Sequence, residues 1–176
     1  MSHLKHYEHT GTARFITLSC YHNYNLFKTD QTKDIFITNL KQLRSKYQFK
    51  LFGFVIMPNH VHLVLLPESD QQLSKIIGVL KSLTAREIFE LWRNIGLEIF
   101  DKLKIIRNGK TQNIFWQRRY YDHNCRTREI TIEKIEYCHR NPVVNGLVEC
   151  QSEWCWSSYN WYNGNKDVIL EMDKLE

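Results

Sequence analysis

The sequence predicts an α+β domain of the ferredoxin-like type, in which helices pack on one face of an antiparallel sheet. Strand and helix patterns follow one another in the order strand, helix, strand, strand, helix, strand-like segment, helix. A Pro-Asn turn joins the two central strands, so these two are expected to form a hairpin. A length of 176 residues with 43% hydrophobic residues is typical of one folded domain, which we take to span residues 1–176.

The spacing of apolar residues predicts the first four elements. Arg14–Cys20 alternates and is rich in β-forming residues, which indicates a strand. Asp30–Tyr47 repeats apolar side chains at helical spacing, with Thr29 or Asp30 as its N-terminal cap. Lys50–Met57 and His60–Leu66 are predicted to be buried strands on either side of the Pro-Asn turn.

The second half of the chain predicts two more helices around a basic region. Gln71–Ile95 has the longest helical pattern. Gly96–Asn113 is irregular and basic, which indicates a loop, and Ile114–Cys125 is expected to be a strand or a strand-like arm. Ile130–Arg140 is a shorter helix that we expect to end at Asn141-Pro142, because a residue before proline avoids the helical conformation.

The remaining features of the chain bear on its location. A C-terminal segment, about residues 150–176, is rich in aromatic residues and is expected to pack back on the domain. No apolar stretch is long enough to cross a membrane, and residues 1–12 lack the apolar core of a signal peptide. The five cysteines include no pair at CxxC spacing, which is typical of reduced thiols. These features predict a cytoplasmic protein.

The net charge of +5 permits a polyanionic partner but does not require one. Between Lys102 and Arg128 the cations are interleaved with aromatic residues. This mixture suits single-stranded nucleic acid, because cations bind phosphates and rings stack on bases. A solvated charged face beside core aromatics explains the same stretch equally well.

His60-Val61-His62 is a candidate metal site. Residues two apart on a strand point to the same face, and two neighbouring imidazoles suit a divalent cation. The pattern is common in a chain with eight histidines, and its simpler explanation is a pair of strand histidines satisfied by hydrogen bonds. The apolar flanks favour the metal, because two buried polar rings need a partner.

Tyr137, on the last predicted helix, is a candidate nucleophile. A phenol oxygen can attack a phosphodiester and form a covalent ester that conserves the bond energy for rejoining. Asn141 lies four residues later, on the same helix face, and its amide oxygen is a candidate third metal ligand. Considered without its context, Tyr137 is more simply explained as a packed helix aromatic.

Four blocks of the sequence resemble the REP-associated tyrosine transposases, which are single-tyrosine HUH transposases of bacterial insertion sequences. The blocks are GFVIMPNHVHLVLLP, IFWQRRYYDHNCR, IEYCHRNPVVNGLV and EWCWSSY, in the family's order, and the resemblance extends from about Phe15 to Tyr159. One departure is Cys125–Arg128, where the family more often has an apolar residue, an arginine and then acids.

The resemblance implies a ferredoxin-like HUH nuclease domain in which His60 and His62, with Asn141 as third ligand, hold Mg or Mn. It implies that Tyr137, shortly before Asn-Pro, is the catalytic nucleophile. Residues of the second block are expected to contact DNA, and they are Trp116, Gln117, Arg118, Arg119 and Arg126.

The predicted function is metal-dependent cutting and rejoining of single-stranded DNA at repeat hairpins, through a 5′-phosphotyrosine intermediate. The protein is expected to be a monomer or homodimer, associated with the nucleoid and not with membranes. One alternative is a relative that binds repeat hairpins with little or no catalysis. Another is a metal hydrolase of small phosphoesters, for which the sequence offers few ligands. Whether Tyr137 works with the histidines of its own chain is open at this point.

Overall fold

The computed structural model describes residues 11–97 and 102–175; the polar residues 1–10 and part of the expected basic loop lie outside it. Its main sheet has the strand order β2-β3-β1-β6, and every neighbouring pair is antiparallel. The four strands are β1 (Ala13–Ser19), β2 (Lys50–Ile56), β3 (His60–Leu66) and β6 (Tyr121–Cys125). The predicted α+β class with an antiparallel sheet is confirmed.

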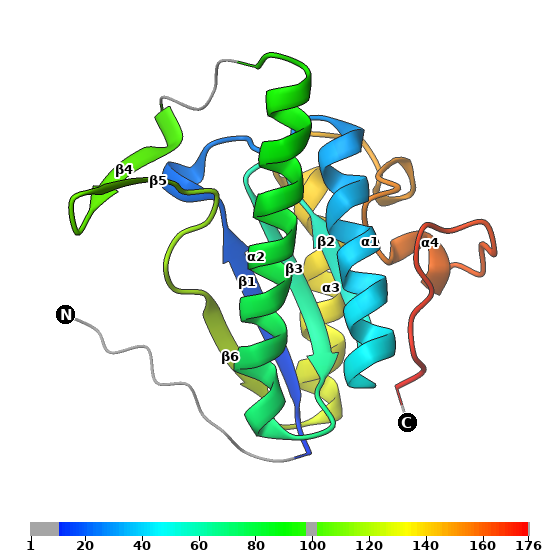
Figure 1. Cartoon of the computed structure of the whole chain (residues 1–176). Coiled ribbons are helices and arrows are strands. Elements are labelled where there is room, and N and C mark those ends of the chain that lie inside the picture. Colours follow the sequence, from blue (N-terminus) through cyan, green and yellow to red (C-terminus); the bar gives the residue numbers. More distant parts are fainter. Residues whose placement is uncertain (1–10, 98–101, 176) are drawn as a thin grey trace.

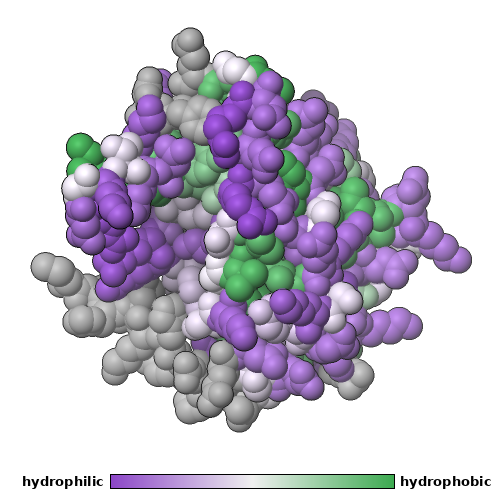
Figure 2. Space-filling model, in the orientation of Figure 1, coloured by the Kyte–Doolittle hydropathy of each residue, from purple (hydrophilic) through white to green (hydrophobic). Residues whose placement is uncertain are grey.

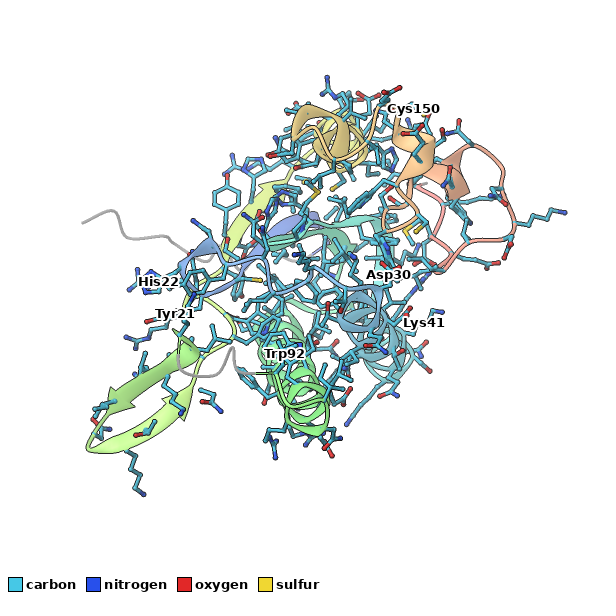
Figure 3. All side chains as sticks on the ribbon, turned by 90° about the horizontal axis from the view of Figure 1, so that it is seen from above. Tyr21, His22, Asp30, Lys41, Trp92 and Cys150 are labelled. Carbon is cyan, nitrogen blue, oxygen red and sulfur yellow. The ribbon has the colours of Figure 1, made fainter. Side chains whose placement is uncertain are left out.

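Helices cover both faces of this sheet (Figures 1 and 3). α1 (Asp30–Tyr47) and α2 (Asp70–Asn94) lie side by side on one face, as predicted, whereas α3 (Arg128–Val144) packs on the other. The prediction of helices on one face is therefore wrong for α3. The strands bury apolar side chains in both directions, so two separate cores form. Within the described residues, no helix is long and apolar enough to span a membrane.

α3 also extends further than predicted, because it continues through Pro142 to Val144. Proline removes one backbone donor from a helix, and in the last turn that loss is small. The chain closes the end with other bonds: Asn145 N–H donates to the carbonyl of Asn141 (3.0 Å) and Leu147 N–H to that of Pro142 (2.9 Å). The whole stretch from Tyr137 to Asn141 therefore lies on one continuous helix.

The expected basic loop contains a two-stranded antiparallel hairpin, formed by β4 (Lys104–Arg107) and β5 (Lys110–Asn113). Asn108 and Gly109 form its turn with positive φ angles of 51° and 72°, the backbone of a tight hairpin turn. We call β4 and β5 with their turn the ribbon. Figure 1 shows that it projects from the side of the molecule, away from the main sheet. The predicted strand-like arm that follows is regular only at β6.

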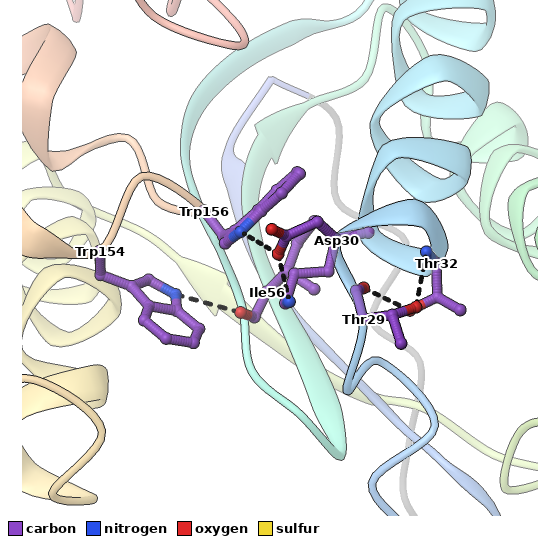
Figure 4. A network of polar contacts seen from close by, with 7 residues as sticks. Thr29, Asp30, Thr32, Ile56, Trp154 and Trp156 are labelled. Carbon is purple, nitrogen blue, oxygen red and sulfur yellow. Dashed lines mark hydrogen bonds and ion pairs between the residues drawn. The ribbon is translucent and has the colours of Figure 1, made fainter.

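The C-terminal segment packs along β2, the edge strand of the main sheet. Its backbone bonds to β2 are Ile56 N–H to Trp156 O (2.9 Å), Ser158 N–H to Phe54 O (3.0 Å) and Asp173 N–H to Leu51 O (2.8 Å). In Figure 4 the indole N–H of Trp154 donates to the Ile56 carbonyl and that of Trp156 to Asp30 Oδ1. We call residues 154–173 the C-terminal cap, since they cover the outer edge of β2 and join it to the start of α1.

Gly53 allows α3 to approach β2 closely. A Cβ added there would lie 3.1 Å from Ile135 Cγ1 and 3.5 Å from Ser158 Oγ. We expect Gly53→Val to lower the free energy of unfolding by about 1–3 kcal/mol, because the extra methyl groups push α3 away from the sheet. Urea denaturation measures this. The same change at Gly78 in α2, where a Cβ meets nothing within 4 Å, should stay within about 0.5 kcal/mol. Equal losses at both positions would contradict the close-packing explanation.

Candidate metal and nucleophile site

The two histidines of the His-Val-His pattern lie side by side on β3. Their ring centroids are 4.6 Å apart, and both rings lie on the face of the sheet that α3 covers. Val61, between them, points into the core beneath α1 and α2. The alternation of side chains along a strand therefore brings the two imidazoles together, as predicted.

Each imidazole is oriented through its Nδ1 atom. Nδ1 of His60 donates to Asn59 Oδ1 at 2.6 Å, because an amide oxygen can only accept, so the lone pair of the neutral His60 ring is on Nε2. Nδ1 of His62 lies 2.9 Å from the hydroxyl of Thr17, its cross-strand partner on β1. Hydrogen bonds of this kind fix ring orientation in metal sites and leave the second nitrogen available.

Nε2 of His62 is buried and has no hydrogen-bond partner in the described part of the chain. The ring is 4% exposed and stacks on Phe15, at 5.0 Å between centroids. Burial lowers the pKa of both histidines, and that of His62 falls to about 3 with a further contribution from His60. Both rings are therefore neutral at neutral pH, the form that binds a metal. A buried, unpaired and neutral nitrogen fits a divalent cation, because it otherwise costs free energy.

Tyr137 lies beside the histidines of its own chain. Its ring centroid is 5.3 Å from that of His62 and 5.7 Å from that of Phe15, and both contacts are edge-to-face. The side chain is nevertheless 46% exposed. The phenol is thus fixed at the histidine pair on one side and open to a large ligand on the other.

Asn141 follows one turn later on α3 and is buried. With Tyr137 it lines a small hollow of about 140 Å³. Its Oδ1 accepts a hydrogen bond from Nδ2 of Asn145 at 2.9 Å. Among the described residues, its side chain bonds to Asn145 and to neither histidine, so its role as third ligand stays a prediction.

The predicted DNA contacts divide into buried and exposed residues. Trp116 is 7% exposed, packs against Phe27 and Phe115, and donates its indole N–H to Lys81 O at 3.0 Å. Its ring packs in the core and leaves little surface exposed, and its contact with DNA stays a prediction. Gln117 is half-buried and donates to Asn23 Oδ1. The three arginines of this set are exposed, namely Arg118, Arg119 and Arg126.

Sequence reasoning missed the residues that support the histidines. Thr17 and Phe15 contact His62 only because β1 lies next to β3, and the strand order could not be predicted. Asn59 directly precedes His60, so that contact had a signal in the sequence. Tyr121 of β6, one of the rings in the basic stretch of the sequence, is 46% exposed and meets the ring of Phe15 edge-to-face at 6.4 Å. It offers an open ring close to Tyr137.

Thr17 provides a test of the site that leaves both histidines in place. We expect Thr17→Val to weaken Mn binding by about 10- to 100-fold, because His62 loses the hydrogen bond that orients its ring. Isothermal titration calorimetry with Mn measures this. Thr84→Val is the matched control, since the Thr84 hydroxyl is buried on α2 and has no partner in the described residues. Unchanged Mn affinity in Thr17→Val would show that this hydrogen bond does not support a metal ligand.

Comparison with known proteins supports the resemblance predicted from the sequence. The family profile described as "Transposase IS200 like" matches residues 9–141. An Escherichia coli K12 REP-associated tyrosine transposase is 25% identical over 161 residues, covering 91% of this chain and 84% of that protein. A Haemophilus influenzae protein provisionally given the same name is 28% identical over 174 residues, covering 93% and 94%.

Among solved structures, a REP-associated tyrosine transposase bound to a REP hairpin has the same fold. It matches with a TM-score of 0.68 at 20% identity, and the match covers 100% of this chain and 94% of that one. The resemblance to REP-associated tyrosine transposases is confirmed.

Proposed function

Because this chain belongs to the IS200-like transposase family, we propose that it cuts and rejoins single-stranded DNA with Tyr137 as the nucleophile. One observation supports this most directly. The Tyr137 ring lies 5.3 Å from that of His62, whose buried Nε2 has no partner among the described residues. A nucleophile and a candidate ligand pair thus come from one chain, so the proposal needs no residue from a second molecule.

In the proposed cleavage step, the phenol oxygen of Tyr137 forms a bond to the scissile phosphorus while the bond from phosphorus to the 3′-oxygen breaks. The phenol proton passes to solvent, and the 3′-oxygen takes up a proton and leaves as a hydroxyl. The product is DNA joined to Tyr137 through its 5′-phosphate. Attack by another 3′-hydroxyl reverses the step and rejoins the strand.

His60 and His62 would hold Mg or Mn, with Asn141 as the proposed third ligand. When bound, such a cation neutralises charge on the phosphate and polarises it for attack. The chain itself positions the imidazoles: Asn59 and Thr17 hold their Nδ1 atoms. Burial keeps both rings neutral by lowering their pKa.

We propose a single strand that carries a repeat hairpin as the substrate. The related solved protein is bound to a REP hairpin. Two features of this chain support the same kind of ligand. The exposed ring of Tyr121 lies on the same face as Tyr137, where an unpaired base can stack. Exposed cations on the adjoining segment, Arg118 and Arg119, can bind phosphates.

The proposal is tested with 5′- and 3′-labelled oligonucleotides that contain the host's repeat hairpins, incubated with Mn. On a denaturing gel we expect a protein-linked DNA and a released strand with a free 3′-hydroxyl. Hairpin binding without any product would assign the protein to the binding-only alternative. Cleaved DNA that never becomes linked to the protein would indicate attack by water, and it would refute the role of Tyr137.

A further inference from the structure

The ribbon lies in a basic stretch of the chain and takes no part in the proposed chemistry. From Lys102 to Tyr121 the sequence contains six cations and no acid. Three of these cations are on the ribbon, and they are Lys104, Arg107 and Lys110. Figure 2 shows strongly hydrophilic residues over this projecting region. Arg107 and Lys110 form no ion pair with any described residue, so their charge is available to a partner.

The ribbon is held firmly at its base. Leu103, just before β4, is fully buried, and Phe115, just after β5, is 2% exposed; both belong to the core beneath α2. Ile114 N–H donates to the Leu103 carbonyl at 2.7 Å and closes the base. The tight Asn108-Gly109 turn closes the tip. A projecting element with both ends fixed is a preformed arm for a partner.

The chemistry of the ribbon favours duplex DNA over a single strand. It has no aromatic residue, and single-strand binding depends on rings that stack on bases. It does have cations, amide and hydroxyl groups, and the exposed Ile106, which is 80% accessible. A two-stranded ribbon fits the major groove, where an apolar side chain can contact a thymine methyl group. The two paired strands lie about 5 Å apart, so the ribbon with its side chains can fit a groove about 12 Å wide.

The base of the ribbon lies at the same end of the sheet as the histidine pair. Trp116, which follows the ribbon, bridges to Cys20 at the end of β1. Cys20 N–H donates to the carbonyl of Asn59, and Asn59 precedes His60. In Figure 3 the ribbon extends beyond the layers of the domain next to Tyr21 and His22. The site lies on the α3 face and the ribbon on the side of α2 (Figure 3), so one DNA molecule would contact both by passing this end of the sheet.

We propose that the ribbon is a duplex-binding arm that enters the major groove of the hairpin stem, while the unpaired flank of the same DNA reaches Tyr137. The inference rests on the proposed function for the identity of the DNA as a repeat hairpin. Binding of duplex DNA by the ribbon does not depend on that function. Beside the ribbon, a hollow of about 610 Å³ is lined by Arg107 of the ribbon and by Arg118 of the segment that follows it, so cations also line the space between arm and body.

The test measures DNA affinity as a function of salt concentration. The ribbon variant replaces its three cations, Lys104→Gln, Arg107→Gln and Lys110→Gln. The probes are a stem-loop with a single-stranded 5′ flank and the same length of DNA with arms that cannot pair. We expect the variant to bind the stem-loop at least about 10-fold more weakly than the wild type. We also expect the plot of log K against log salt to be less steep, with a slope smaller in magnitude by about 2–3. Its affinity for the unpaired DNA should stay within about 2-fold.

Two matched variants complete the design. The first, the α1–α2 variant, removes the same charge from exposed positions on these two helices, and it should bind the stem-loop like the wild type. Its changes are Lys41→Gln, Lys46→Gln and Lys75→Gln. The second keeps the charge of the ribbon and should also bind the stem-loop like the wild type. Its changes are Lys104→Arg, Arg107→Lys and Lys110→Arg. The inference is overturned if the ribbon variant binds the stem-loop normally, if it loses both probes equally, or if the α1–α2 variant loses as much. Wild-type protein that shows the ribbon-dependent slope but never cuts DNA would refute the proposed catalysis alone.

Discussion

Tyr137→Phe is expected to abolish both strand cleavage and the protein-linked product, with a fall in rate of at least about 1,000-fold. The change removes only the phenol oxygen. The ring keeps its edge-to-face contacts with His62 and Phe15, so the fold and the binding of DNA should not change. The measurements are single-turnover cleavage on a denaturing gel and, in parallel, hairpin affinity by fluorescence anisotropy.

Tyr121→Phe is the matched control for this variant. Both tyrosines are 46% exposed and both meet the ring of Phe15 edge-to-face, but Tyr121 is on β6 and not on α3. Its variant keeps the ring that we expect to stack on a base, so cleavage should continue at a rate close to that of the wild type. If Tyr137→Phe still forms the covalent product and Tyr121→Phe does not, the nucleophile is Tyr121 on β6 and not Tyr137 on α3.

His62→Gln is expected to remove Mn binding and to slow cleavage by at least about 1,000-fold, because the cation supplies several kcal/mol of charge stabilisation to the reaction. Glutamine fills a similar volume beside Phe15, so the packing of β1 on β3 is largely kept. Chelation of the metal by EDTA should produce the same loss in the wild type, and excess Mn should restore it. Calorimetry with Mn separates loss of the metal from loss of DNA binding.

His139→Gln is the control for this change. His139 is also buried, and its Nε2 lies 2.9 Å from Ser158 Oγ, where α3 meets the C-terminal cap. Its replacement should lower stability without any change in Mn affinity, because the ring faces away from Tyr137 and the pair on β3. Retention of normal Mn binding by His62→Gln would exclude the pair as the metal site.

The local pattern was enough to predict the pairing of His60 with His62. Alternation along one strand decides which face a side chain occupies, and it needs no knowledge of the neighbouring strands. The contact with Tyr137 was different, because it depends on α3 covering the same face. The apolar run of β2 did indicate that a helix covers this second face, because a strand that is apolar at successive positions is buried on both faces.

Two other regions show where composition misleads. The ribbon was predicted to be a loop because its strands are polar and short, although Asn108-Gly109 is a strong hairpin signal. Trp116 was predicted to contact DNA because it stands among cations, yet its ring fills the core. Phe115 and Trp116 are both buried, only a few residues before the exposed Arg118 and Arg119, so a basic stretch can contain buried rings.

The C-terminal cap has a consequence for how molecules of this protein can meet. An uncovered edge strand is a template on which another chain can add a strand of its own, and such addition leads to sheets that run through several molecules. Here residues 156, 158 and 173 already satisfy the outward backbone groups of β2. A protein shortened before the cap would expose that template and should self-associate. Among the described strands of the main sheet, the other edge is β6, at the opposite side, and that edge is the one left for joining two main sheets.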